Sequence, residues 1–309
     1  MIKRVLVFSN PTHLSISLNQ LVAVFPEPKD GDEKRSFPVE DIGIVVLDNP
    51  RITVTQAAIS ALLEANTAIL SSSANHLPNG LMLPLCGNTL QSRIFRRQTE
   101  LSVPAKKKAW KQTVEAKIKN QIRLLECERQ DAAPLKLLLK NVKSNDAENC
   151  EGQAAAWYWK NIFGKSKNFV RSRDGEFPNA LLNYGYAVLR AVVARALVCA
   201  GLHPTLGIFH RNKYNAYCLA DDLMEPYRPF VDKAVLEILA KEPQTDSLTK
   251  QAKGRLYAVC FDDALIGGNT RPLMLAAMQT ASSFSKIVLG EKAEIDYPSM
   301  PAYGKTQRV

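Results

Sequence analysis

The spacing of apolar residues changes near residue 90, and this change limits the folds open to the chain. Before it, Val, Ile and Leu gather in short runs with partial alternation, which is typical of strands. After it, apolar residues recur at intervals of three and four, as they do on helices. We therefore expect an α+β protein. A small N-terminal β-rich domain (residues 1–88) should precede a larger all-α domain (residues 89–309).

The first part of the chain is predicted to be a small β-sandwich or β-sheet lobe with one short helix. Turn-forming residues occur at Asn10-Pro11, at 28–32 and at 77–80. Residues 55–65 have apolar positions at helical spacing, and Thr55 is placed to cap that helix. The segments with strand character are residues 3–9, 13–25, 42–47, 67–71 and 81–85.

Beyond residue 90 the first strong helical pattern carries an apolar stripe and many basic residues. The stripe runs from Trp110 through Val114 and Ile118 to Leu125. Most of the nearby basic residues, Lys117 among them, fall off that stripe. The pattern predicts an amphipathic helix whose outer side is basic.

Residues 178–202 form the longest apolar segment, and they contain no acid. We expect this segment to be the core helix of the second domain, ended by Gly201. Arg190 and Arg195 interrupt the apolar run, which argues against a membrane span. Two further helices are predicted at 234–241 and 272–283, and a loosely ordered tail at 297–309.

Most of the net charge of +10 lies in one central stretch. Residues 91–143 hold fourteen Lys and Arg against five Asp and Glu. Such a stretch suits a polyanion-binding surface, although a solvated helix face has the same composition. The six cysteines form no CxxC pair, and the four histidines show no zinc-like spacing. These features, with an N-terminal apolar run too short for a signal peptide, predict a reduced, cytoplasmic protein.

Three segments place ionisable residues where chemistry could occur, and each also has a structural explanation. Glu151 stands at the start of a small-residue helix, where a carboxylate can simply complement the helix N-terminus. His210 follows an apolar pair and is compatible with a core role. Asp222 and Glu225 are three apart and share a helix face, which suits either a cation site or an acidic surface turn. Arg228 is a candidate partner for these acids.

Together, two carboxylates and one imidazole suit Mg²⁺ or Mn²⁺ better than zinc. A divalent ion beside a basic surface is a common arrangement for phosphodiester chemistry, because the ion polarises the phosphoryl oxygen. The residues alone are therefore compatible with a metal-dependent enzyme that acts on nucleic acid, and the structural explanations given above stay open beside it.

Several segments, taken in order along nearly the whole chain, resemble one family. They are residues 151–163 (EGQAAAWYWKNIF), 177–191 (FPNALLNYGYAVLRA) and 201–232, which contain GIFHRN and DLMEPYRP. Residues 39–55 and 74–85 give weaker support. The chain is similar to the integrase and endonuclease of CRISPR spacer acquisition, in the form that accompanies type II systems. The resemblance implies a β-strand domain followed by an α-helical catalytic domain.

The resemblance also implies roles for individual residues. Glu151, His210 and Glu225 correspond to the family's catalytic, metal-binding residues. Many members have Asp at the last position, where this chain has Glu, as type II forms tend to. Asp222 is given a supporting role, and His203 none. The residues implied to hold the DNA backbone are Arg93, Arg96, Arg97, Lys106, Lys107, Lys108, Arg211 and Lys213.

The implied reaction is attack by the 3′-hydroxyl of a short DNA fragment on a phosphodiester of the CRISPR array, with DNA cleavage in the same site. The implied partners are double-stranded DNA, a second copy of the chain, and a small ferredoxin-like CRISPR-associated protein, with two dimers flanking one partner dimer. The N-terminal domain would serve dimerisation and docking. The type II effector nuclease and an accessory acquisition protein are further implied partners. Two alternatives stay open: a nuclease on branched DNA without integration, and a non-catalytic DNA-binding scaffold.

Overall fold

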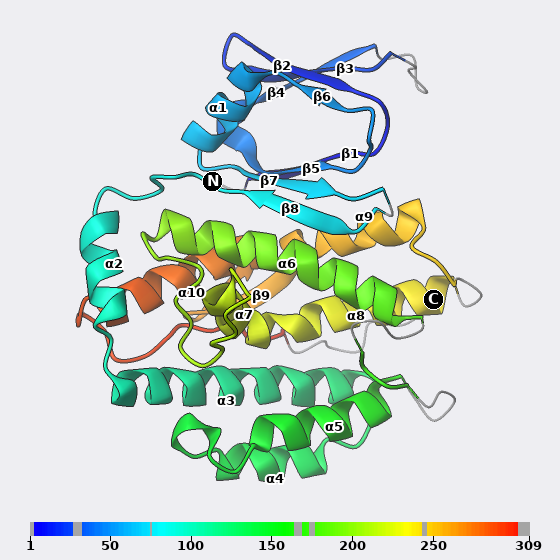
Figure 1. The fold of residues 1–309 in the computed structure, drawn as a ribbon. Helices are drawn as coiled ribbons and strands as arrows, with labels where there is room; N and C mark the ends of the chain where they lie inside the picture. Colours follow the sequence, from blue (N-terminus) through cyan, green and yellow to red (C-terminus); the bar gives the residue numbers. More distant parts are fainter. Residues whose placement is uncertain are drawn as a thin grey trace. The chain divides into compact units, whose positions relative to one another are not determined.

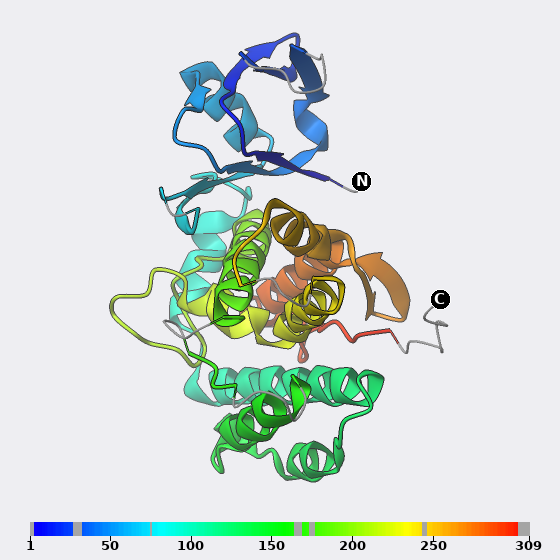
Figure 2. The same cartoon turned by 90° about the vertical axis from the view of Figure 1, so that its right-hand side faces the viewer.

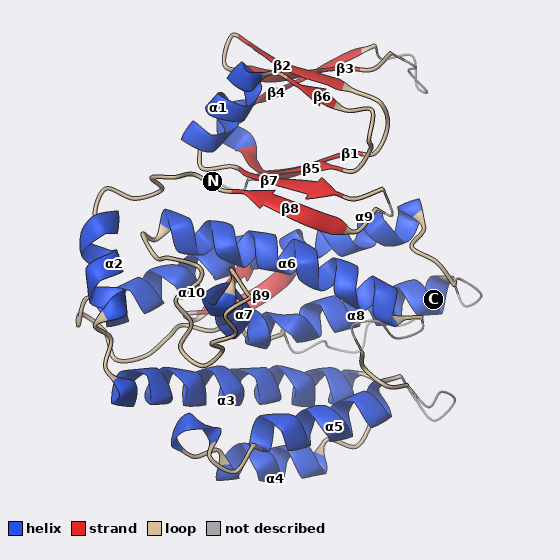
Figure 3. Ribbon diagram, in the orientation of Figure 1, coloured by secondary structure: helices blue, strands red, loops and turns tan. Residues whose placement is uncertain are grey.

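The computed structural model describes residues 3–26, 33–74, 76–163, 169–172, 177–242 and 246–301, and it consists of two compact units. The units are Met1–Thr89 and Leu90–Val309, so the division falls one residue from the predicted boundary. Figure 3 shows strands dominating the first unit and helices the second. The predicted α+β class is confirmed. One short antiparallel pair of strands, β9 and β10, adds to the helices of the second unit.

The N-terminal unit is built from two four-stranded sheets and one helix (Figure 1). One sheet has the order β1-β5-β7-β8 and the other β4-β3-β2-β6. Strands β1, β5 and β7 run parallel, and β8 closes their sheet antiparallel to β7. The elements are β1 (Arg4–Phe8), β2 (His13–Ser17), β3 (Gln20–Val24), β4 (Lys34–Pro38), η1 (Val39–Asp41), β5 (Ile42–Leu47), β6 (Thr53–Val54), α1 (Gln56–Glu64), β7 (Ala68–Ser72) and β8 (Pro78–Met82).

The core of this unit lies among apolar residues of both sheets and of α1. Leu14 and Leu21 come from one sheet, Val45 and Ile69 from the other, and Leu62 from α1. The Thr55 hydroxyl accepts a hydrogen bond from the Ala58 amide, so the predicted helix cap is confirmed. Burial of alternate strand residues thus joins the two sheets and the helix into one core.

Two local predictions in this unit are wrong. Residues 13–25 are not one strand but the hairpin β2–β3, because Leu18 and Asn19 both adopt positive φ and turn the chain. Residues 78–80, predicted as a turn, belong to β8; the chain turns just before them, where the Ser73 amide donates to the Leu77 carbonyl. The turn predicted at 28–32 lies outside the described residues.

In the C-terminal unit, the long helix α6 packs against α7, α8, α9 and α10 (Figures 1 and 2). Helices α4 and α5 pack against α3 and against each other. The elements are α2 (Gln91–Thr99), α3 (Val103–Cys127), α4 (Ala133–Asn141), η2 (Ser144–Asp146), α5 (Cys150–Ile162), α6 (Asn179–Cys199), α7 (Cys218–Met224), η3 (Glu225–Tyr227), α8 (Arg228–Lys241), α9 (Lys250–Ala258), η4 (Val259–Phe261), β9 (Asp263–Ile266), β10 (Asn269–Pro272) and α10 (Leu273–Val288).

Helix α6 is the core helix that the sequence predicts. It is long and apolar enough to cross a membrane, but 78% of its most apolar stretch is buried within the protein, as in a core helix. A Cβ on Gly185 would lie 2.4 Å from Cγ1 of Val231, so glycine allows α6 and α8 to approach closely. The chain leaves the helix at Gly201, whose φ of 78° suits glycine.

Helix α3 carries a buried polar stripe beside its apolar one. Asn120 is fully buried, and its side-chain amide donates to the carbonyls of Pro226 (2.7 Å) and Pro298 (3.0 Å). Its Oδ1 accepts from the Met300 amide at 3.0 Å. One side chain therefore fixes both η3 and the C-terminal segment to α3. The prediction of a loose tail is wrong for residues 297–301, which pack on α3, and residues 302–309 lie outside the description.

We expect Asn120→Ala to lower the free energy of unfolding by about 2–4 kcal/mol, because it leaves buried backbone groups without partners. Urea denaturation monitored by circular dichroism measures this change. Asn141→Ala is the control, since Asn141 is exposed at the end of α4 and should lie within about 0.5 kcal/mol of the parent. A loss for Asn120→Ala as small as that of the control would contradict the anchoring role.

Candidate active site

Glu151 is placed by the first turn of α5. Asp146 accepts hydrogen bonds from the amides of Cys150 (2.8 Å) and Glu151 (2.9 Å), and the Asn149 side chain accepts from the Gly152 amide. These residues satisfy the free amides of the helix start. The Glu151 carboxylate is therefore not needed as a cap, and it points instead to a cation on α3.

That cation is Lys117, which bridges two carboxylates. Its Nζ lies 2.6 Å from Oε1 of Glu151 and 2.6 Å from Oε2 of Glu225. The Lys117 side chain is only 11% exposed, so it does not belong to the basic outer side of the helix, where the sequence pattern had placed it. Burial would lower the pKa of Lys117, but the neighbouring Glu225 and Glu151 carboxylates outweigh burial and raise it.

Glu225 lies at the start of η3 and is held by two cations. Its second oxygen, Oε1, accepts from Nε of Arg228 at 2.8 Å. Burial alone would raise the pKa of Glu225; Arg228 and Lys117 outweigh it and lower the pKa to about 2. The alternative of an acidic surface turn is excluded, because Glu225 and Asp222 are both buried.

Arg228 also contacts an aromatic side chain of the core. Its guanidinium lies 4.5 Å from the ring centroid of Tyr186, a cation–π contact. The hydroxyls of Tyr186 (2.5 Å) and Tyr158 (2.7 Å) both donate to Asp232. Burial raises the pKa of Asp232 to about 6, despite the two hydroxyl donors. Arg228 is thus held by the Tyr186 ring as well as by its ion pair with Glu225.

His210 is oriented by Asp222, which is fully buried on α7. Nδ1 of His210 lies 2.6 Å from Oδ1 of Asp222. The same carboxylate accepts from the amides of Ile208, Phe209 and His210 at 2.7 to 3.1 Å. This arrangement fixes the imidazole with Nδ1 as the donor and leaves Nε2 as the acceptor. Asp222 therefore holds both the loop and the ring.

The loop before His210 requires glycine at position 207. A Cβ there would lie 2.4 Å from the His210 carbonyl oxygen and 2.9 Å from Oδ2 of Asp222. The obstacle includes backbone, which cannot move away like a flexible side chain. Next to it Phe209 stacks on Trp110 with centroids 4.1 Å apart, and Trp110 meets the His210 ring edge-on. Sterics and stacking together restrict the position of His210.

The predicted metal ligands are close but do not stand in a ligating set. Among the residues that the structure describes, no three His, Cys, Asp or Glu side chains have the arrangement that a metal ion would require. Glu151 and Glu225 converge on Lys117, whereas His210 is held by Asp222. The donor types nevertheless suit a hard divalent cation. Oε2 of Glu225 is buried, and among the described residues its partner is the Lys117 ammonium at 2.6 Å, a cation in the place an ion would take.

The predicted DNA-contacting residues divide into two groups. Lys106, Arg211 and Lys213 line a cleft of about 470 Å³ together with His210. The cleft also includes Gln98, whose buried side chain ties α2 to the loop by bonds to the backbone of His203 and Leu206. The remaining basic residues do not line it: Arg93, Arg96, Arg97, Lys107 and Lys108, all exposed on α2 and α3.

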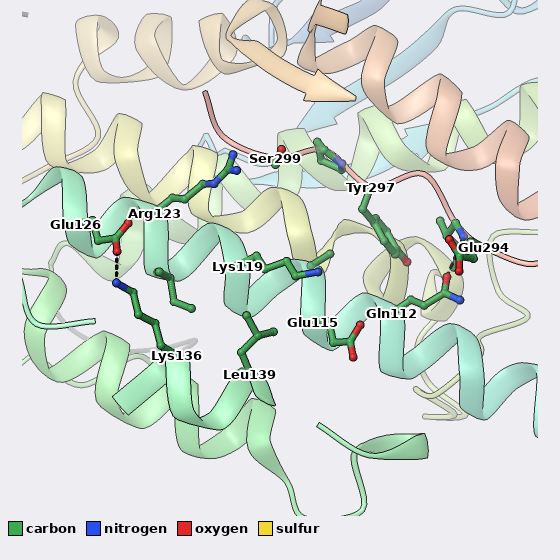
Figure 4. A pocket seen from close by; sticks show the side chains of 14 residues that line it. Gln112, Glu115, Lys119, Arg123, Glu126, Lys136, Leu139, Glu294, Tyr297 and Ser299 are labelled. Atoms are coloured by element: carbon green, nitrogen blue, oxygen red, sulfur yellow. Dashed lines mark hydrogen bonds and ion pairs between the residues drawn. The ribbon is translucent and has the colours of Figure 1, made fainter. Parts of the chain in front are cut away.

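A larger hollow of about 680 Å³ lies elsewhere on α3, between it, α4 and the segment around Tyr297 (Figure 4). Both acidic and basic side chains line it, and Glu126 pairs with Lys136 at 2.6 Å. None of the predicted site residues lines this hollow. Its volume therefore does not make it the candidate active site.

Comparison with known proteins agrees with the family suggested by the sequence. The family model "CRISPR associated protein Cas1" matches residues 5–264. CRISPR-associated endonuclease Cas1 of Neisseria meningitidis serogroup C is 34% identical over 293 residues, which cover 94% of each chain. A CRISPR-associated endonuclease Cas1 of Pyrobaculum aerophilum is 26% identical over 268 residues, covering 82% of this chain and 90% of the relative.

Solved structures share the fold at low sequence identity. A casposase bound to integration product has a TM-score of 0.78 and 21% identity, covering 100% of this chain and 96% of its own. A CAS1 protein from Thermotoga maritima has a TM-score of 0.74 and 14% identity, and the match covers 94% of this chain and 98% of that protein. A Cas6-RT-Cas1–Cas2 complex has a TM-score of 0.71 and 19% identity, covering 94% of this chain and 35% of that one.

The fold, the site and these matches define the class of protein as a CRISPR-associated nuclease. The chain belongs to the family of CRISPR-associated protein Cas1. The resemblance seen in the sequence is thereby confirmed at the level of the family.

The bond to Asp222 raises the pKa of His210 above its ordinary value of 6.5, although burial acts in the opposite direction. We expect Asp222→Asn to lower that pKa, because it removes the negative partner and keeps the side-chain shape. Titration of the ring by NMR measures the change. In the parent, the His210–Asp222 pair should stabilise the folded protein fully at pH values below the unfolded-state pKa of His210. That stabilisation should be lost as the pH rises through the raised pKa of His210 in the folded protein. The same His210 pKa in parent and variant would contradict the pairing.

Proposed function

We propose that this chain is a metal-dependent DNA endonuclease and integrase of CRISPR adaptation. It joins the 3′-hydroxyl of a short foreign DNA fragment to the CRISPR array by transesterification. The observation that carries the proposal is the converging carboxylate pair of buried Glu225 and partly exposed Glu151, bridged by one cation, beside an imidazole oriented by Asp222. A largely buried pair of acids that requires a cation is an expected feature of a divalent-ion site.

Glu151, Glu225 and Nε2 of His210 would hold the ion, which is Mg²⁺ or Mn²⁺. When bound, such an ion polarises a phosphodiester and stabilises the charge that develops during transfer. Asp222 keeps the imidazole in the tautomer that leaves Nε2 available. Arg228 holds Glu225 through Oε1 and leaves Oε2 directed at Lys117.

The basic residues divide the work of holding DNA. Lys106, Arg211 and Lys213 lie in the cleft with His210 and would hold the strand near the reacting phosphate. The exposed arginines of α2, Arg93, Arg96 and Arg97, and the lysines Lys107 and Lys108 would hold the duplex further away. Such contacts fix the position of the DNA without reading its sequence.

The proposal extends to partners and location. We expect a homodimer that joins a small ferredoxin-like protein, two dimers to one partner dimer, in line with the solved complex that contains Cas1 and Cas2. The type II effector nuclease and an accessory acquisition protein are further expected partners. With free cysteines only among the described residues, we place the protein in the cytoplasm.

Strand transfer of a labelled short duplex into a supercoiled array plasmid tests the function. With Mn²⁺ or Mg²⁺, and with the small partner protein present, the parent should give half-site product, and EDTA should abolish it. Glu151→Ala, His210→Ala and Glu225→Ala should each abolish transfer, because each removes a proposed ligand. DNA binding should be largely retained.

Glu148→Ala is the matched control, since Glu148 lies three residues before Glu151 and pairs only with Lys143 in the described ion pairs. It should keep parental activity. Cleavage without joining in every condition would favour the nuclease on branched DNA. DNA binding without any metal-dependent product in the parent would favour the scaffold. Retained transfer in His210→Ala would remove that residue from the ligand set.

Reversal of Arg93, Arg96 and Arg97 to Glu should weaken DNA binding and flatten its dependence on salt. Each lost phosphate contact lowers the slope of log K against log salt by about 1. Fluorescence anisotropy with a labelled duplex at several salt concentrations measures the slope. The control reverses the exposed residues Lys250, Arg271 and Lys286 instead. An unchanged slope in the α2 variant would show that these arginines form only a solvated face.

A further inference from the structure

Lys117 stands inside a largely buried cluster of four charged side chains, in which Lys117 and Glu225 are buried and Glu151 and Arg228 are each 22% exposed. Lys117 and Arg228 supply two positive charges, and Glu151 and Glu225 supply two negative charges, so the cluster is neutral as a whole. Glu225 is the shared member: Arg228 contacts its Oε1, and Lys117 contacts its Oε2. Glu151 has Lys117 as its cation. Removing Lys117 would leave one net negative charge among buried groups.

The position of Lys117 on α3 leaves its ammonium little choice of partner. Val114 and Ile118, its neighbours one turn before and one residue after, are fully buried, and the side chain of Lys117 is almost buried as well. A buried lysine is costly unless it is paired. The two carboxylates provide that pairing at 2.6 Å each, which places Nζ between them.

A divalent ion at this site would need the same oxygen atoms. Mg²⁺ binds oxygen at about 2.0–2.1 Å, closer than the ammonium does. An ion that contacted the two oxygens now held by Lys117 would lie close to the present position of Nζ, and its charge would repel the ammonium. Occupation by Lys117 and occupation by the ion exclude each other, unless the lysine moves away.

We propose that Lys117 is a built-in competitor of the divalent ion: it holds Glu151 and Glu225 together in the metal-free protein and must leave them before the ion binds. This inference rests on the proposed metal site. Lys117 is in this sense a positioning residue, which keeps the carboxylates converged at the expense of metal affinity. The neutral cluster then binds a divalent ion more weakly than two bare carboxylates would.

The competition predicts the direction in which the Mn²⁺ affinity changes when the charge of Lys117 is removed. Lys117→Met retains most of the length and apolar character of the side chain and removes its charge. Without metal, the variant leaves two carboxylates close together with Arg228 as their cation, so its melting temperature in EDTA should fall by about 4 °C or more. With the competitor removed, Mn²⁺ should bind at least about tenfold more tightly than in the parent.

Mn²⁺ binding is measured by electron paramagnetic resonance of the free ion, and unfolding by scanning calorimetry, for the full chain without DNA. Lys111→Met is the matched control, because Lys111 lies on the same helix and pairs with Glu115 away from the site. It should leave the Mn²⁺ affinity unchanged. Lys117→Gln, which keeps a neutral hydrogen-bond donor, provides a second variant with the same expected tightening if Lys117→Met does not fold.

Equal or weaker Mn²⁺ binding in both Lys117 variants would overturn the inference. The lysine would then have no effect on the affinity for Mn²⁺, or would increase it. The background for non-specific binding is set by Glu225→Ala. Failure of the proposed function is distinct: transfer that is absent or insensitive to EDTA in the parent refutes the enzyme, while tighter Mn²⁺ binding after loss of Lys117 still supports the competition.

Discussion

The ion pair cluster around Lys117 is the interaction on which the arrangement of the site depends. It connects three elements that are distant in the sequence: α3 through Lys117, α5 through Glu151, and η3 through Glu225. None of the three charges is well solvated, so each needs the others to offset its burial. The hydrogen bonds of Asn120, one turn along α3, hold the backbone beside Glu225 in register with the lysine. Packing and charge pairing thus specify the same geometry.

The second half of the site is held by Asp222, which contacts the backbone amides and the imidazole of one loop. One carboxylate accepts from three loop amides and pairs with the imidazole, so the amides of residues 208–210 have partners without regular secondary structure. Gly207 permits the close approach that this requires. The two halves differ in how they respond to an ion. Nε2 of His210 has no hydrogen-bond partner among the described residues, whereas Oε1 of Glu151 and Oε2 of Glu225 already contact the Lys117 ammonium.

Much of the fold could be predicted, because the spacing of apolar residues and the residues that form turns are local features of the sequence. The helix after Thr55, the core helix before Gly201 and the change of character near residue 90 follow from the sequence. The hairpin within residues 13–25 was missed, since Leu18 and Asn19 are not a strong turn pair. Lys117 was placed on the outer side because only apolar residues defined the stripe. Yet Thr113, Lys117 and Asn120 recur at intervals of four and three, and this buried polar row was the available signal.

The charge pattern assigns separate roles to the surface and the interior. The excess of positive charge in residues 91–143 lies largely on exposed residues of α2 and α3, where it attracts a polyanion over a distance. The largely buried cluster is neutral, so it adds little to that attraction. A divalent ion that displaced Lys117 would still leave the cluster positive, because the ion and Arg228 together carry more charge than the two carboxylates. A phosphodiester beside it would then offset part of that charge, so binding of the ion and of DNA would favour each other.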